Sequence, residues 1–325
     1  AGAVVTGASF GDKLSPLSDS TNLAAATAQA GLFDHVRHML KTTVPSFLLA
    51  LVVYGIISTT LDANAGNPEV IEKLTSVIDA NFKISPLIFI PPVIIILMIG
   101  LKVPPVPGML VGVIAGVVMC FYQGADVGTI LTTIYSGPTI ETKNEMVDKL
   151  LARGGLLFMM ETISLVICAL SFGGAIKAIG AVDTIIETIL KHVRRRGSII
   201  ATNVVMSIFC NFAAADQYMS IVIPGQMYKK VYKQLNMAPE NLSRTLEDAG
   251  TLTSGLVPWS TCGAVYLATL NVSAFAYGRY HLIGIINPII AIVYAYAGIF
   301  LNPLDKSKPI KTRLTDEDIA EMDKA

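Results

Sequence analysis

Three short stretches of the sequence combine acidic side chains with hydroxyl and amide groups in otherwise apolar surroundings. They are GDKLSPLSDSTNLA (residues 11–24), NFAAADQYMS (211–220) and LEDAGTLTSGLVPWSTCGA (246–264). Carboxylate, hydroxyl and backbone carbonyl oxygens are hard ligands, whereas soft metals prefer sulfur or imidazole. A carboxylate that is removed from water also holds a proton or a cation more readily than it stays bare. These stretches therefore predict a site at which Na⁺ and a proton compete.

We expect side chains from all three stretches to bind the ion. The candidate Na⁺ ligands are Asp12, Ser15, Asp19, Thr21, Asn22, Asn211, Asp216, Ser220, Glu247, Asp248, Thr251, Ser254 and Thr261. Asp216 and Ser220 share a helix face if the chain is helical after Ala213, because they are four residues apart. Glu161, in another apolar segment, is a candidate proton relay, with a plain hydrogen bond to Ser164 as the alternative.

Two of the stretches also have a plainer interpretation. Asp12 and Asp19 could cap helices on either side of a loop outside the membrane. Glu247 and Asp248 could lie at a helix amino terminus, where the helix dipole favours acidic side chains. Pro16, however, argues against an unbroken helix through the first stretch. Backbone groups released by a break are tolerated at membrane depth only where they line a cavity or a site.

The composition indicates lipid as the solvent. Of the 325 residues, 53% are apolar and 15% are charged, whereas soluble chains average roughly 45 to 50% apolar and about 25% charged residues. The formal net charge is zero, which gives no reason to expect nucleic acid as a partner. The cysteines occur singly and without CxxC spacing, so we interpret them as packing residues: Cys120, Cys168, Cys210 and Cys262.

Several apolar segments approach the roughly 20 residues that a helix needs to cross a bilayer. Four are predicted to be plain spans: residues 44–61, 84–101, 103–125 and 281–304. We expect Pro91 and Pro92 to kink the second of these, and a tight KVPPVP turn to join it to the third. Three other segments carry polar or proline interruptions: residues 155–176, 198–228 and 249–278. We expect 198–228 to be a re-entrant hairpin, with one long tilted helix as the alternative.

The remaining segments define the predicted domain organisation. Residues 1–304 form the transmembrane domain, and residues 305–325 form a polar, solvated tail with one short helix. The chain opens on an apolar run without methionine or signal peptide, from which we expect upstream helices to be missing. Basic stretches at residues 35–41, 194–196 and 229–233 are typical of cytoplasmic loops.

The sequence resembles the NhaC-type family of Na⁺/H⁺ antiporters, within the larger ion transporter superfamily. The resemblance rests on FGDKLSPLSDSTNLA (10–24), DHVRHMLKTTVP (34–45), ADQYMSIVIPG (215–225) and EDAGTLTSGLVPWSTCGA (247–264). It implies an all-α, polytopic membrane helix bundle with re-entrant hairpins, discontinuous helices and an inverted repeat. By that mapping, residues 12–22 belong to the hairpin of the first repeat and residues 211–220 to that of the second.

The resemblance implies secondary active exchange of Na⁺ for H⁺, in a multi-pass protein of a prokaryotic cell membrane, rather than catalysis. Na⁺, H⁺ and membrane lipid are the expected partners, no cofactor is expected, and a homodimer is left open. The alternative is Na⁺- and H⁺-coupled exchange of small carboxylates such as malate and lactate, which other family members carry out. An intramembrane aspartyl protease is disfavoured because Asp216 follows three alanines instead of lying in a GxGD motif. A channel is disfavoured because no repeated ring of charge is visible.

Overall fold

The computed structural model describes residues 1–60, 68–81, 84–101, 103–138, 192–270 and 272–324, with scattered residues between 148 and 189. The predicted relay Glu161 lies outside the described residues. The chain divides into two compact units, one formed by residues 1–58 and 168–325 and the other by residues 59–167. All the candidate ion ligands belong to the first unit.

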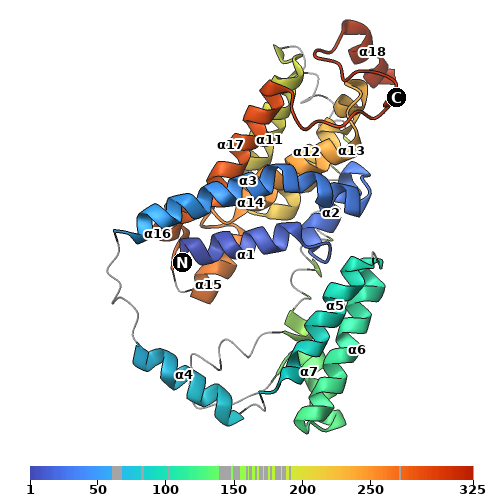
Figure 1. The fold of residues 1–325 in the computed structure, drawn as a ribbon. Coiled ribbons are helices and arrows are strands. Elements are labelled where there is room, and N and C mark those ends of the chain that lie inside the picture. Colours follow the sequence, from blue (N-terminus) through green and yellow to red (C-terminus); the bar gives the residue numbers. More distant parts are fainter. Residues whose placement is uncertain are drawn as a thin grey trace. The chain divides into compact units, whose positions relative to one another are not determined.

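The first unit is a bundle of helices, many of which are short or interrupted (Figure 1). Its elements are α1 (Gly2–Leu14), α2 (Asp19–Ala28), α3 (Leu32–Ser58), α11 (Arg196–Ala214), α12 (Gln217–Gln234), α13 (Pro239–Leu246), η2 (Glu247–Thr251), α14 (Leu252–Ser254), α15 (Thr261–Leu270), α16 (Ala274–Tyr277), η3 (Gly278–Tyr280), α17 (Leu282–Ala297) and α18 (Asp316–Lys324). Among the described residues, extended pairing is limited to two isolated bridges. The predicted all-α, polytopic class is confirmed.

The first break separates α1 from α2. Helix α1 ends at Leu14, α2 begins at Asp19, and Pro16 lies between them, where its ring and missing N–H prevent a continuous helix. The amide of Asn22 donates to the carbonyls of Pro16 (2.9 Å) and Ser18 (2.7 Å), which fixes the turn. The predicted interruption is therefore confirmed.

The second break separates α11 from α12. Ala215 adopts the left-handed conformation, with φ at 57°, and Asp216 caps α12 by accepting from the backbone amides of Tyr218 (2.8 Å) and Met219 (3.1 Å). The two helices pack against each other. The alternative of one long tilted helix is therefore wrong, and residues 198–228 form a helical hairpin.

The third interruption is a change of helix type. Helices α13 and α14 are continuous through η2, a π-helical segment in which Glu247 and Asp248 are fully buried. The alternative that these acids lie at a helix amino terminus is wrong, because the helix begins eight residues before Glu247, at Pro239. Single π turns inside α-helices often occur at functional sites, since they redirect the side chains that follow.

The same order of elements occurs twice in this unit: two helices separated by a chain break, followed by a third helix. Helices α1 and α2 precede α3, and helices α11 and α12 precede the α13–η2–α14 helix. This order is what the predicted repeat requires. The inverted orientation of the two halves stays a prediction.

The second unit contains α4 (Pro68–Asn81), η1 (Pro86–Phe89), α5 (Ile90–Gly100), α6 (Pro105–Gln123) and α7 (Val127–Ser136). Helices α5 and α6 pack together. The kink expected at Pro91 and Pro92 is wrong, because both prolines lie in the first turn of α5, after the 3₁₀ turn η1. At that position a proline's missing N–H costs no intrahelical bond.

Three described helices are long and apolar enough to cross a membrane: Leu32–Ser58, Val106–Gln123 and Arg196–Ala214. A fourth span exists if Ala274–Tyr280 and Leu282–Ala297, which are bent by 54° at His281, count as one. The span expected at residues 281–304 is shorter than predicted, because its helix ends at Ala297 before Gly298, a left-handed residue. The chain is a polytopic membrane protein.

The tail contains the predicted short helix, α18, but it is not freely solvated. Leu314 and Met322 are buried in the main hydrophobic cluster, together with Tyr228, Tyr232 and Leu235. The tail also hydrogen-bonds through its backbone to both ends of the hairpin, so it belongs to the packed structure of the first unit.

Candidate functional site

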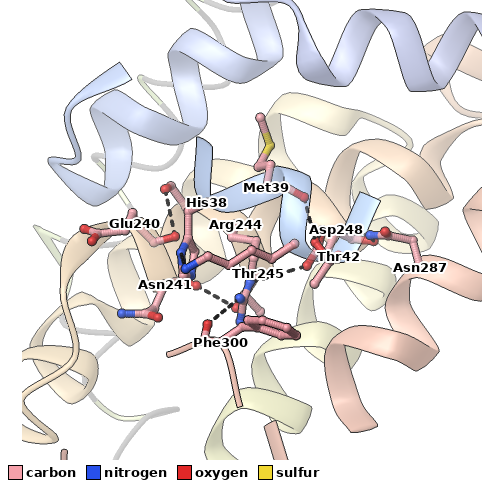
Figure 2. A network of polar contacts seen from close by, with 12 residues as sticks. His38, Met39, Thr42, Glu240, Asn241, Arg244, Thr245, Asp248, Asn287 and Phe300 are labelled. Atoms are coloured by element: carbon pink, nitrogen blue, oxygen red, sulfur yellow. Dashed lines mark hydrogen bonds and ion pairs between the residues drawn. The ribbon is translucent and has the colours of Figure 1, made fainter. Parts of the chain in front are cut away.

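A buried ion pair lies at the centre of the first unit. It joins Lys13, in the last turn of α1, to Asp248, in the π segment, and both side chains are 0% exposed. The carboxylate atom Oδ1 of Asp248 accepts from Lys13 Nζ, from Thr42 Oγ1 (2.9 Å) and from Asn287 Nδ2 (2.7 Å). Figure 2 shows Thr42 and Asn287 converging on Asp248. Because a buried charge is costly unless it is paired and hydrogen-bonded, this carboxylate is held and compensated.

A second cation lies on the other side of the same carboxylate. Arg244 is one helical turn before Asp248, and its Nε is 3.8 Å from Asp248 Oδ2. Its Nη1 donates to the carbonyl of Phe300 at 2.7 Å, as Figure 2 shows. Neither Arg244 Nε nor Asp248 Oδ2 makes a hydrogen bond. Asp248 is therefore flanked by two positive side chains.

Helix α3 supplies one polar face to this centre. Thr42 and Ser46 are four residues apart, and Ser46 Oγ donates to Asn287 Oδ1 at 2.8 Å. His38 and His35 precede them on the same face and are also buried. Both ring nitrogens of His35 and Nε2 of His38 have no hydrogen-bond partner.

Glu247 directly precedes Asp248 in the sequence, but its carboxylate differs from that of Asp248 in its hydrogen bonding. Its side chain is fully buried, and neither carboxylate oxygen has a hydrogen-bond partner among the described residues. The hydroxyls of Thr251 and Ser20 and the charge of Lys13 lie in its surroundings. The hydroxyl oxygen of Thr251 is likewise buried and unpartnered. Among the described residues, the centre thus contains one carboxylate that is hydrogen-bonded through one oxygen, Asp248, and one without a hydrogen bond, Glu247.

The two chain breaks meet next to this centre. The hydroxyl of Tyr218 donates to Asp19 Oδ2 at 2.6 Å, which joins the start of α12 to the start of α2. Thr261 Oγ1 donates to Asp216 Oδ2 at 3.3 Å. Asp216 is buried, whereas Asp12 and Asp19 are exposed. The predicted carboxylates therefore form two groups, a buried pair in η2 and a more open group at the breaks.

Several predicted ligands make hydrogen bonds to nearby backbone groups, and their role as ion ligands stays a prediction. Ser15 Oγ accepts from the amide of Leu17 at 3.2 Å, and Thr21 Oγ1 donates to the carbonyl of Lys13 at 3.0 Å. Asn22 fixes the first break. These three side chains hold the α1–α2 turn in place.

Asn211 and Ser220 hold the hairpin against the π segment. Asn211 Nδ2 donates to the carbonyl of Gly250 at 2.6 Å, and its Oδ1 has no partner. Ser220 Oγ donates to the carbonyl of Gln217 at 2.6 Å. The expected pairing of Asp216 with Ser220 at one ion has no bond to support it among the described residues, because Asp216 caps α12. Ser254 Oγ is buried and unpartnered.

The side chains that sequence reasoning missed come mainly from outside the three acidic stretches. They are Lys13, His35, His38, Thr42, Ser46, Arg244 and Asn287. The motif DHVRHMLKTTVP contains three of them at helical spacing, His35, His38 and Thr42, and that periodicity was the available signal. Within the described residues, no three histidine, cysteine or acidic side chains converge as a metal-binding group.

Long apolar helices around a buried charged centre, with chain breaks beside it, are typical of polytopic membrane transporters. The model of the Na⁺/H⁺ antiporter family matches residues 7–299, which include Lys13, both breaks and the π segment. The chain belongs to this family, as the resemblance predicted.

Known relatives agree with the family. The chain is 40% identical over 307 residues to the Na⁺/H⁺ antiporter NhaC of Alkalihalophilus pseudofirmus, which covers 92% of this chain and 65% of that protein. It is 34% identical over 298 residues to NhaC of Bacillus subtilis, with 91% and 66% covered. It is 32% identical over 302 residues to the malate-2H⁺/Na⁺-lactate antiporter of Bacillus subtilis, with 93% and 64% covered. No solved structure matches the chain. The chain spans about two-thirds of the length of these relatives.

Proposed function

We propose that this chain carries the ion-exchange site of a secondary transporter that moves Na⁺ in exchange for H⁺ across a cell membrane. The observation that carries the proposal is the buried centre, where Lys13 and Arg244 face Asp248 and the adjacent Glu247 is also fully buried. Each charged side chain at membrane depth costs about 2.5 to 3.5 kcal/mol on insertion scales, so four of them together need a functional reason.

The charges of this centre explain why exchange would be coupled. Two positive and two negative side chains balance when all four are ionised. Binding of one Na⁺ or of one H⁺ gives the centre the same net charge of plus one. Binding of both would leave a larger excess of positive charge in a medium of low dielectric constant. Binding of Na⁺ then favours release of H⁺, and the reverse holds on the other side of the membrane. The proposal needs no cofactor and no covalent chemistry, so the chain would act as a transporter and not as an enzyme.

A second candidate is Na⁺- and H⁺-coupled exchange of small carboxylates, which the malate and lactate relative suggests. A carboxylate substrate would need a cationic side chain to bind it. In the described centre, Lys13 and Arg244 already face Asp248, and Arg244 also bonds to the carbonyl of Phe300. This arrangement favours an inorganic cation as the substrate.

The test is a flux measurement on the full-length protein in proteoliposomes that contain a pH-sensitive dye. An inward Na⁺ gradient, without any organic anion, should drive protons out of the vesicles, while an equal choline gradient should not. Proton movement that requires malate or lactate would select the second candidate. No Na⁺-driven proton movement under either condition would contradict both.

A further inference from the structure

We propose that Glu247, together with the hydroxyls of Ser20 and Thr251, binds the transported cation, and that Asp248 does not. The inference rests on the proposed function for the identity of the cation, Na⁺. It assigns different roles to two adjacent acids that the sequence treats alike.

Asp248 has no room for a further positive charge. Its Oδ1 already accepts three hydrogen bonds, one of them from the ammonium of Lys13. Its Oδ2 faces the guanidinium of Arg244. A cation at this carboxylate would lie against two like charges in a site closed to water, where Coulomb repulsion is weakly screened. Asp248 is better suited to position Lys13 and Arg244.

The carboxylate of Glu247, unlike that of Asp248, can accept a further positive charge. Its carboxylate is fully buried, and within the part of the chain that the structure describes both oxygens lack hydrogen-bond partners. A bare carboxylate away from water is strongly unfavourable, so an ionised Glu247 requires a bound cation. Lys13 lies in the surroundings of Glu247 but is bonded directly to Asp248, so among the described residues the charge of Glu247 has no directly bonded partner and can be neutralised by a bound cation.

Oxygen co-ligands are available from two elements. Thr251 follows Glu247 by one turn of the π segment, and its hydroxyl oxygen is buried without a partner. Ser20 lies in the first turn of α2, which packs against η2; its side chain is fully buried, lies near Glu247 and shares a hydrogen bond with the hydroxyl of Ser18, at 3.1 Å. A hydroxyl oxygen has two lone pairs, so each can still coordinate a cation. A carboxylate with hydroxyl neighbours forms a hard, oxygen-only donor set, which suits Na⁺.

The helix geometry explains how two neighbouring acids come to have different partners. Successive side chains on a helix point about 100° apart, and the π turn changes that angle locally. Asp248 is directed towards α3 and α17, through Thr42 and Asn287. Glu247 is directed towards the start of α2, through its proximity to Ser20.

The proposal is tested by Na⁺ binding to the purified full-length protein in detergent. Binding is measured by isothermal titration calorimetry and by the rise in melting temperature with NaCl, with choline chloride at equal ionic strength as the reference. Ligand binding to the folded state raises its stability with concentration. Glu247→Gln should abolish the Na⁺-dependent rise, and Thr251→Val and Ser20→Ala should each weaken Na⁺ affinity several-fold.

The matched control is Glu240→Gln, at the start of the same helix. Glu240 accepts from the amide of Asn302 at 2.8 Å, and glutamine preserves that bond. This variant should bind Na⁺ as wild type does. Unchanged Na⁺ binding by Glu247→Gln would overturn the proposal. This holds also if the variant binds Na⁺ normally but no longer releases protons, because Glu247 would then carry the proton and not the cation.

Folding of Glu247→Gln is checked by size-exclusion chromatography and circular dichroism. If this variant does not fold, the hydroxyl variants decide, and wild-type affinity in both Thr251→Val and Ser20→Ala would overturn the site. A different result would contradict the proposed transport function. Wild-type protein that binds Na⁺ through Glu247 but moves no protons in liposomes would contradict antiport and leave the binding site intact.

Discussion

Lys13 and Asp248 are 235 residues apart in the sequence, yet their side chains form a fully buried ion pair. The pair connects the end of α1, immediately before the first chain break, to the π segment in the third acidic stretch. Removing one partner of a buried pair leaves an uncompensated charge, which typically costs about 3 to 5 kcal/mol.

Lys13→Met should therefore lower the free energy of unfolding by about 3 to 5 kcal/mol. The double variant Lys13→Met, Asp248→Asn should recover part of that loss, because the two remaining buried charges, Arg244 and Glu247, balance each other. Unfolding in detergent, followed by circular dichroism, measures both. Lys308→Met is the control, since its pair with Asp305 is exposed and should contribute at most about 1 kcal/mol. Equal losses in the single and double variants would show that the charge imbalance is not the cause.

Gly250→Ala should destabilise the contact between the hairpin and the π segment. A Cβ atom at Gly250 would lie 2.7 Å from Ser220 Oγ and 3.1 Å from the Ser220 carbonyl oxygen. Overpacking of this kind costs about 1 to 3 kcal/mol, which thermal unfolding would detect. At Gly7, in α1, a Cβ atom meets nothing within 4 Å. Gly7→Ala should therefore be neutral or stabilising, by up to about 1 kcal/mol. Similar effects at both positions would contradict the close approach to Ser220.

Ala215→Gly should stabilise the protein or leave it unchanged. Ala215 has a φ of 57° at the tip of the hairpin, a conformation that glycine adopts without steric cost. The adjacent Ala214 is helical, so Ala214→Gly should cost about 0.5 to 1 kcal/mol. The difference in melting temperature between these neighbouring variants is the measurement. A larger loss at Ala215 than at Ala214 would show that the left-handed turn is not what favours glycine there.

Docking of the tail should weaken in acid. Burial raises the pKa of Asp318, but hydrogen bonds from Lys311 and from Thr315 outweigh burial and bring its pKa below the ordinary value of 3.8. A carboxyl group whose pKa is lowered by folding stabilises the folded state above its unfolded pKa, and that contribution is lost as the pH falls through the lower, folded value.

Hydrogen exchange of the α18 amides, corrected for intrinsic rates, should therefore show protection at pH 7 that declines below about pH 4. Asp318→Asn should reduce the protection at pH 7 and remove most of this decline. Glu317→Asn, next to it on α18, should leave the pH dependence unchanged. A decline in Asp318→Asn as large as in wild type would assign the pH dependence to another group.

Features that depend on local sequence were predictable. Pro16 lies in the break between α1 and α2, and Pro258 lies in the gap between α14 and α15. A proline disrupts a helix whatever the tertiary packing around it, so such breaks can be predicted from the sequence. The membrane class followed from composition, and the three acidic stretches do lie in one unit of the structure.

Features that depend on tertiary packing were not predictable. Nothing near Lys13 indicates that its partner is Asp248, and hydrophobic periodicity does not reveal a π turn at Glu247. The position of Pro91 was misjudged because the helix start depends on the preceding 3₁₀ turn. The different surroundings of Glu247 and Asp248 follow from which helices pack against each, and a sequence pattern treats the two acids as equivalent.

The tail also has a mechanical consequence for the hairpin. Residues 303–314 bond through their backbone to the beginning of α11, at Arg194 and Arg196, and to the residues after α12, at Leu235 and Asn236. Both legs of the hairpin are thus clamped at their base, while the tip at Ala215 lies a helix length away, about 28 Å for 19 residues. Because the two legs are joined at their base, they would rotate there together. One degree of such a rotation would displace the tip by about 0.5 Å. The short tail therefore joins the two legs of the hairpin at the end that lies farthest from the chain break at Ala215.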